Sequence, residues 1–136
     1  MAVRFINVDL DLESKSPLDY LCLELSSGKD VHHLHCGPNG RGYSATLECA
    51  NGGETCEAES VIHRFCEVIE GLDERAMGEW MAAHLRTFDI GYEVSGADLR
   101  WKTELRHATL TRVAALGASI AFTVYPADGS ISHVEV

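Results

Sequence analysis

Three histidines and a cysteine stand close together in the segment VHHLHC, just before a glycine-rich stretch. If this segment is a β-strand, His33 and His35 point to the same side, and Cys36 lies next to them. With Cys49 or Cys56 they offer the nitrogen and sulfur ligands that zinc binds in a tetrahedron. However, the spacing matches no standard zinc module, and the sequence has no Cys-x-x-Cys pair. We expect no cofactor, and we keep as the alternative a zinc site at His33, His35, Cys36 and Cys49.

A cysteine nucleophile is the second chemistry that these residue types could support. Cys36 adjoins the glycine-rich stretch, and Cys56 lies near a predicted helix start, where the helix dipole lowers the pKa of a thiol. Either could pair with His35 or His63. With five cysteines and seven histidines in 136 residues, some proximity arises by chance. We therefore expect a non-enzymatic protein, and a small metal-binding or thiol enzyme around the histidines and cysteines is the alternative.

Acidic residues follow one side of several predicted strands. The segment INVDLDLE, residues 6–13, alternates apolar and polar residues without a break, as in a strand with one buried face. Carboxylates two residues apart on a strand lie about 7 Å apart, within the Debye length of about 8 Å, so they raise each other's pKa values. We call the polar positions that should share one uncovered sheet face the acidic face: Asn7, Asp9, Asp11, Glu13, Ser44, Thr46, Glu48, Asp89, Glu93, Thr123 and Tyr125.

Three interpretations of the acidic face remain open. The simplest is a solvated face neutralised by Arg100, Lys102 and Arg106 from a neighbouring strand. The second is a docking surface for a basic protein partner, such as the basic site of a toxin nuclease. A divalent ion held by Asp9, Asp11 and Glu48 is the third, although no calcium-loop spacing is present. The docking hypothesis assigns partner contacts to Asp9, Asp11, Glu13, Glu48, Asp89, Glu93 and, as an aromatic anchor, Tyr125.

The elements that must position these residues follow from periodicity and from turn signals. The expected strands cover residues 3–13, 31–36, 43–49, 88–94, 99–106 and 119–126, and the expected helices cover residues 17–25, 55–70, 74–86 and 107–116. In the helix after residue 73 we expect Met77, Trp80, Met81 and Leu85 to face inward, and in the last strand Ile120, Phe122 and Val124. This order predicts one α+β domain over residues 1–136, a two-layer sandwich with a mainly antiparallel sheet and helices on one face.

Charge and composition limit the partners. The net charge of −10 argues against binding to nucleic acid, whose phosphates attract basic proteins. We find no signal peptide or membrane-spanning stretch in the sequence, and an odd number of cysteines argues against a disulfide framework. We therefore expect a cytoplasmic protein that binds another protein, not a membrane. It would be a monomer, or a homodimer that covers the sheet face with a second copy.

The latter half of the chain resembles small uncharacterised bacterial α+β domains. The resemblance runs from ESVIHRFCEVIE through FDIGYEV to VAALGASIAFTVYP, which is a helix, a strand, a short helix that ends in Leu-Gly and a last strand that ends in Tyr. Such families include domains of unknown function and immunity proteins found beside toxins. The resemblance therefore implies an immunity-type binding role and carries over no catalytic residue.

Overall fold

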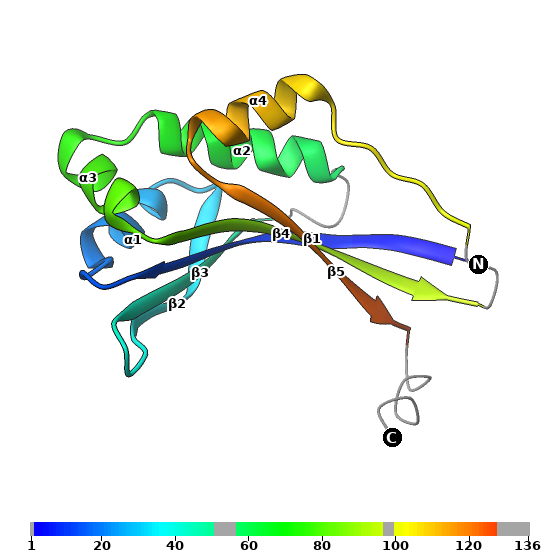
Figure 1. The fold of residues 1–136 in the computed structure, drawn as a ribbon, viewed down its shortest axis with the longest axis horizontal. Coiled ribbons are helices and arrows are strands. Elements are labelled where there is room, and N and C mark those ends of the chain that lie inside the picture. Colours follow the sequence, from blue (N-terminus) through cyan, green and yellow to red (C-terminus); the bar gives the residue numbers. More distant parts are fainter. Residues whose placement is uncertain (1, 51–56, 97–99, 128–136) are drawn as a thin grey trace.

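The computed structural model describes residues 2–50, 57–96 and 100–127. This part of the chain contains four helices and five strands, whose arrangement Figure 1 shows. In chain order they are β1 (Ala2–Ser14), α1 (Asp19–Leu25), β2 (Val31–Pro38), β3 (Tyr43–Cys49), α2 (Ala58–Glu70), α3 (Glu74–Ala82), β4 (Leu85–Ser95), α4 (His107–Ala115) and β5 (Ser119–Pro126). None of the described helices is both long and apolar enough to cross a membrane.

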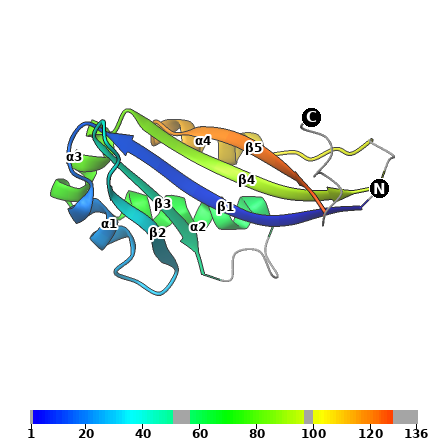
Figure 2. The same cartoon turned by 90° about the horizontal axis from the view of Figure 1, so that it is seen from below.

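All five strands form one sheet in the order β2-β3-β1-β4-β5. The pairs β2–β3, β3–β1 and β1–β4 are antiparallel, whereas β5 runs parallel to β4 after the crossover through α4. The helices lie on one side of the sheet (Figure 1), and the view from below presents the strands in front of them (Figure 2). The prediction of an α+β fold with a mainly antiparallel sheet and helices on one face is confirmed.

The core lies between the sheet and the helices, and α2 contributes more buried residues to it than any other described helix. Apolar residues at helical spacing give α2 one buried stripe, which packs on alternate residues of the central strands. All six residues expected on this stripe are buried, namely Ala58, Val61, Ile62, Phe65, Cys66 and Ile69. From β1 they meet Val8, Leu10 and Leu12, each at most 1% exposed. The residues between these three therefore face the other side of the sheet.

A β-bulge at Ile6 changes the phase of β1. Phe5 pairs with Tyr92 and Asn7 pairs with Gly91, so Ile6 is an extra residue without a partner of its own. The alternation of the sequence predicted Ile6 on the helix side with Val8, and this was wrong. Ile6 instead lines a hollow on the open side of the sheet.

Residues 99–106 were predicted as a strand, and this was also wrong for the part that the structure describes. Residues 100–106 run without regular structure to the start of α4. Both edges of β4 are already occupied, by β1 and by β5, so no place remains beside it for a hairpin partner. The ring of Trp101 instead packs edge-on against Tyr92, with 4.8 Å between the ring centroids.

Several apolar expectations differ from the structure. Helix α3 ends at Ala82, since Ala83 is already extended, and Met81 near this end is 61% exposed. Leu85, which was predicted to face inward from this helix, instead begins β4 and pairs with Glu13 of β1. In β5, Ile120 packs against the core, but Phe122 and Val124 are 52% and 54% exposed. Because they pair with Ile90 and Tyr92, they lie on the helix side of the sheet, as predicted. They are exposed because they lie at the edge of the sheet, where no described helix buries them.

Candidate functional site

The acidic face lies on the side of the sheet opposite the helices. The strand registers place its residues on one surface, because Asp9 pairs with both Glu48 and Asp89, and Asp11 pairs with Thr46. In the part of the chain that the structure describes, no helix covers this surface (Figure 2). The sequence prediction of its position is therefore confirmed for the central strands.

Asp9 is the centre of the acidic face. It lies between Glu48 of β3 and Asp89 of β4, so three carboxylates from neighbouring strands stand side by side. Partial burial of Asp9, together with the negative charges of Asp11, Glu48 and Asp89, raises its pKa from 3.8 to about 6. No lysine or arginine in the described residues forms an ion pair with it. Its negative charge is therefore uncompensated.

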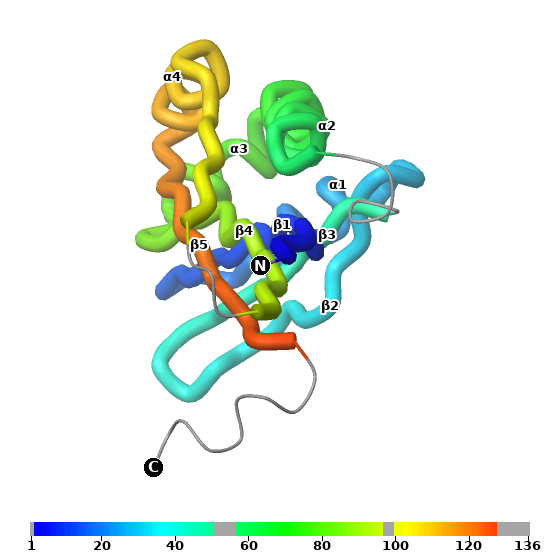
Figure 3. Tube along the Cα trace, turned by 90° about the vertical axis from the view of Figure 1, so that its right-hand side faces the viewer, coloured from blue at the N-terminus to red at the C-terminus, as the bar shows by residue number. Residues whose placement is uncertain are grey.

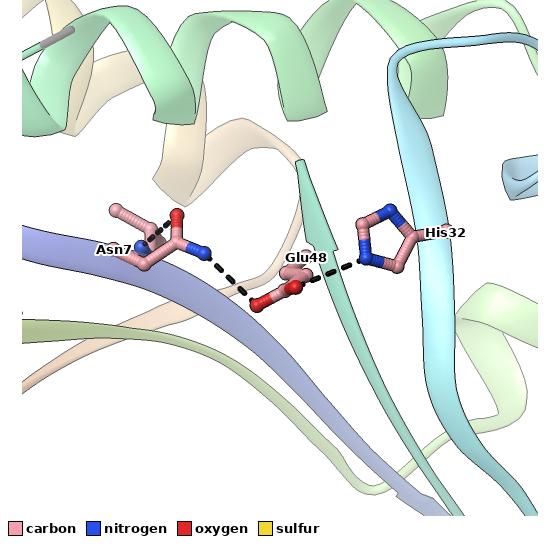
Figure 4. Close-up of polar contacts among 4 residues, drawn as sticks. Asn7, His32 and Glu48 are labelled. Carbon is pink, nitrogen blue, oxygen red and sulfur yellow. Dashed lines mark hydrogen bonds and ion pairs between the residues drawn. The ribbon is translucent and has the colours of Figure 1, made fainter. Parts of the chain in front are cut away.

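Glu48 is held by two neighbours, as Figure 4 shows. The amide of Asn7 donates to one carboxylate oxygen at 2.9 Å, and Nε2 of His32 lies 3.0 Å from the other. The carbonyl oxygen of the Asn7 side chain accepts from the backbone N–H of Val8, which fixes the amide in this orientation. These contacts orient the Glu48 carboxylate at one side of Asp9.

Threonines hold two further carboxylates. Thr46 donates to Asp11 at 3.2 Å, and Thr123 donates to Asp89 at 2.8 Å. Partial burial raises the pKa of Asp11 although this hydrogen bond opposes the shift. Neutral donors therefore orient these carboxylates without cancelling their charge.

Glu13 and Glu93 lie at opposite ends of the face and have basic neighbours. Arg4 forms an ion pair with Glu93 at 3.1 Å, and Nε2 of His84 lies 3.7 Å from Glu13. Both pairs are exposed, where such contacts stabilise a protein little. Glu13 and Glu93 are therefore partly neutralised by their neighbours and attract a basic partner less strongly than Asp9 does.

Tyr125 forms one wall of a hollow of about 240 Å³ beside Asp9. Its ring lies over Gly91, where an added Cβ would be 3.6 Å from Cε2 of the tyrosine. Ile6, Asn7, Glu48 and Asp89 complete the lining. Gly91 was not among the predicted site residues, although a glycine in the middle of a strand often marks a close approach of another group.

The internal neutralisation predicted from Arg100, Lys102 and Arg106 is not found. Residues 100–106 do not belong to the sheet, and Arg106 lies 3.7 Å from Glu59 on the helix side. Arg100 and Lys102 are exposed. The cross-strand ion pairs that this interpretation required therefore do not form in the described structure.

The predicted zinc ligands do not come together. A bulge in β2 adds a residue between His33, which pairs with Leu47, and His35, which pairs with Thr46, so the two histidines face opposite sides. Cys36 pairs with Ala45, which is four residues from Cys49 along β3, or about 13 Å. Among the described residues, no group of three or more histidine, cysteine or acidic side chains is arranged to hold a metal ion.

The predicted thiol pairs find no support in the described residues. His35 contacts Ser44 at 3.1 Å, and Cys36 lies against the backbone oxygen of Leu18. Cys56 falls outside the described residues. Burial raises the pKa of Cys66 to about 11 and also raises that of Cys22, which leaves little thiolate on either residue at neutral pH.

A second polar group, which was not predicted from the sequence, joins α2 to α4. Thr109 donates to Glu59 at 2.7 Å, Nε2 of His63 lies 2.9 Å from the same hydroxyl, and Nη1 of Arg112 lies 3.1 Å from Nδ1 of His63. Glu70 accepts two further bonds from Arg112. Glu59, His63 and Thr109 line a hollow of about 460 Å³ between the two helices.

The direction of these hydrogen bonds excludes the pair of His63 and Thr109 as a catalytic base and its nucleophile. A guanidinium can only donate, so Nδ1 of His63 must accept from Arg112 and Nε2 must carry the proton. The imidazole therefore donates to Thr109, whereas a general base must accept the proton of the nucleophile. In this arrangement the group links two helices.

No family model, curated protein or solved structure matches the chain at a significant level. The resemblance of its latter half to immunity-type domains therefore stays a prediction.

Proposed function

We propose that the acidic face binds a basic segment of a protein partner and that the protein acts by binding, without catalysis. The observation that carries this proposal is the position of Asp9 between Glu48 and Asp89 on an open face, where no described lysine or arginine pairs with it. A cation from a partner placed there would lower the pKa of Asp9 and offset the mutual repulsion of the three carboxylates.

The hollow beside Asp9 supports the choice of a protein partner. Tyr125 is 50% exposed and lies at its rim, and tyrosines of this kind often carry much of the binding free energy at protein interfaces. The carboxylates would supply attraction and orientation, and the ring would supply apolar contact. A lysine or arginine side chain has both an apolar stem and a charged end, which suits this combination.

An inhibitor of the immunity type is the form of this function that we favour. A toxin nuclease must carry a basic surface to hold its nucleic acid, and an acidic protein face can occupy that surface. We propose a cytoplasmic location for the complex. The free thiols of Cys22, Cys36 and Cys66 support a reducing compartment.

Affinity capture with matched charge variants tests the proposal. The wild-type chain is immobilised and exposed to a lysate of the source organism, and bound protein is eluted with rising salt. The variant Asp9→Asn with Asp11→Asn removes two charges from the acidic face. The control Asp30→Asn with Glu67→Gln removes two charges from exposed positions outside it.

We expect a basic protein that the wild type and the control retain, and that the Asp9 and Asp11 variant retains at least about tenfold less. Retention should also weaken as the pH falls through about 6, because Asp9 then takes up a proton. The proposal fails if no salt-sensitive protein binds, or if the two variants retain it equally.

A further inference from the structure

The two edges of the sheet differ in how well they are protected against another strand. β2, at one edge, is interrupted by the bulge between His33 and His35 and ends in Pro38. Such interruptions hinder edge-to-edge pairing. β5, at the other edge, has the sequence SIAFTVYP, which contains no charged residue. Apart from its final proline, β5 has none of the usual protective features.

The backbone of β5 offers hydrogen bonds to a further strand. The N–H of Ala127 donates to Val94 of β4 at 2.8 Å. Because successive amides of a strand point to opposite edges, the amides of Ile120, Phe122 and Val124 face away from β4. In the described part of the chain no strand lies beyond them. Three N–H and three C=O groups therefore face outward.

The side chains of the same residues form an apolar patch. Phe122 and Val124 are about half exposed on the helix side of the sheet, where β5 descends from α4 along one side of the molecule (Figure 3). Trp101, which is 42% exposed, contacts the ring of Tyr92, and Tyr92 is the register partner of Val124. A strand added at this edge would cover an aromatic and aliphatic surface.

A second copy of the chain fits this edge, because β5 contains no charged residue and can pair with itself so that apolar residues meet. Residues 100–126 contain four basic residues and one acidic residue, whereas the rest of the sequence contains seven basic and twenty acidic residues. Two such acidic chains repel each other over most of their surface. The edge at β5 is where they can approach without bringing carboxylates together.

We infer that two copies of the chain pair through β5 in an antiparallel two-fold arrangement centred on Phe122, which joins their sheets. This centre places Phe122 opposite the partner's Phe122 and Ile120 opposite the partner's Val124, so apolar residues meet on the helix side. Ala121 meets the partner's Thr123 on the other side. The outward amides then form six hydrogen bonds across the junction.

The size of this contact predicts a dimer that dissociates on dilution. A stable interface buries about 800 Å² on each partner, and one eight-residue strand supplies only part of this area. The apolar side chains of Phe122, Val124 and Trp101 must therefore contribute. The contact leaves the acidic face open, so the dimer does not depend on the proposed partner binding.

Analytical ultracentrifugation of the full chain over a concentration series tests the inference. We expect a shift from monomer to dimer with rising concentration. Phe122→Lys should move the midpoint at least about tenfold higher, since it places a charge on the edge. Leu34→Lys is the matched control, because Leu34 is 56% exposed in β2 at the opposite edge, and it should leave the midpoint unchanged. Circular dichroism establishes that each variant is folded.

Crosslinking tests the centre of the pairing. Hydrogen-bonded partners in antiparallel strands have Cα atoms about 5.5 Å apart, a distance that a disulfide can bridge. Phe122→Cys should therefore form a covalent dimer under mild oxidation, and Leu34→Cys should not. A chain that stays monomeric at all concentrations overturns the inference, as does a dimer that Phe122→Lys leaves intact. A dimer that appears only after residues 128–136 are removed also overturns it, because those residues would then occupy the edge.

Discussion

Asp9 of β1 and Asp89 of β4 are register partners in the antiparallel centre of the sheet, and both carboxylates face its open side. Because Asp9 is partly buried and lies among the negative charges of Asp11, Glu48 and Asp89, its pKa is raised to about 6. The ionised carboxylate of Asp9 therefore lowers the stability of the folded protein, and this is a cost in folding free energy. A bound cation would remove part of that cost.

The first prediction concerns Asp9→Asn. The folded chain holds a proton that the unfolded chain releases between pH 3.8 and about 6, so the wild type loses stability as the pH rises through this window. The variant lacks the charge. It should be more stable than the wild type above pH 6, by about 1 kcal/mol when solvent screening is allowed for. The gain should vanish below about pH 4.

Urea unfolding at several pH values between 3.5 and about 8 checks this prediction, since the midpoint reports the free energy of unfolding. Asp30→Asn, at an exposed position in the loop after α1, is the control and should follow the wild type. A gain in stability that does not depend on pH would show that the charge of Asp9 is not what destabilises the wild type.

The sequence predicted the open acidic face because successive side chains of a strand point to opposite faces of the sheet. If the apolar residues are buried on one face, the acidic residues between them must lie on the other. It could not predict that the bulge at Ile6 reverses this phase, because an apolar residue at that position fits the alternation equally well. The segment 99–106 alternates like a strand. Its described residues, 100–106, do not pair with β4, because β5, a later segment of the chain, already occupies that edge of β4.

Helix contacts show the same limit. The apolar stripe of α2 is local information, and all its predicted residues are buried. The polar link from Glu59 and His63 to Thr109 joins residues about fifty positions apart. No spacing within either helix indicates that these side chains meet, and His63 was therefore predicted only as a partner for a cysteine.

The second prediction tests this link with Thr109→Val. Valine keeps the shape of threonine but cannot donate to Glu59 or accept from His63, and Thr109 is only 2% exposed. We expect the free energy of unfolding to fall by about 1–3 kcal/mol, since buried polar groups lose their partner. Thr111→Val, an exposed position on the same helix, should change it by less than about 0.5 kcal/mol. Equal losses in thermal unfolding would show that the hydroxyl contributes nothing specific.

The third prediction concerns Arg86, which binds the ends of two helices. Its guanidinium donates to the carbonyl oxygens of Trp80 and Ala83 at the end of α3 and to that of Gly117 after α4. Lysine keeps the charge but cannot donate in three directions from one plane. We expect Arg86→Lys to lower the free energy of unfolding by about 1–3 kcal/mol.

Arg41→Lys is the control for Arg86→Lys, because Arg41 is exposed in the turn between β2 and β3. Chemical denaturation of both variants gives the comparison. If Arg86→Lys unfolds at the same urea concentration as the control, the helix-end contacts do not contribute measurably to stability.

The fourth prediction separates the hollow on the acidic face from the stability of the fold. A Cβ at Gly91 would make ordinary contacts with Tyr125, Asn7 and Ile6 at 3.6–3.8 Å, so alanine fits there. Glycine within a strand costs conformational entropy, and Gly91→Ala should leave the protein equally stable or up to about 1 kcal/mol more stable. Gly37→Ala is the matched control, because Gly37 lies in β2 with nothing within 4 Å of its Cβ position.

Both glycine variants should unfold alike, but only Gly91→Ala adds a methyl group among the residues that line the hollow beside Asp9. If a basic partner places a side chain there, Gly91→Ala should weaken the salt-sensitive capture severalfold, and Gly37→Ala should not. Capture that is equal for both variants would mean that the partner contacts the carboxylates without entering the hollow. The binding role of Tyr125 would then be lost while the role of Asp9 remained, because the added methyl group lies against the Tyr125 ring and not against the Asp9 carboxylate.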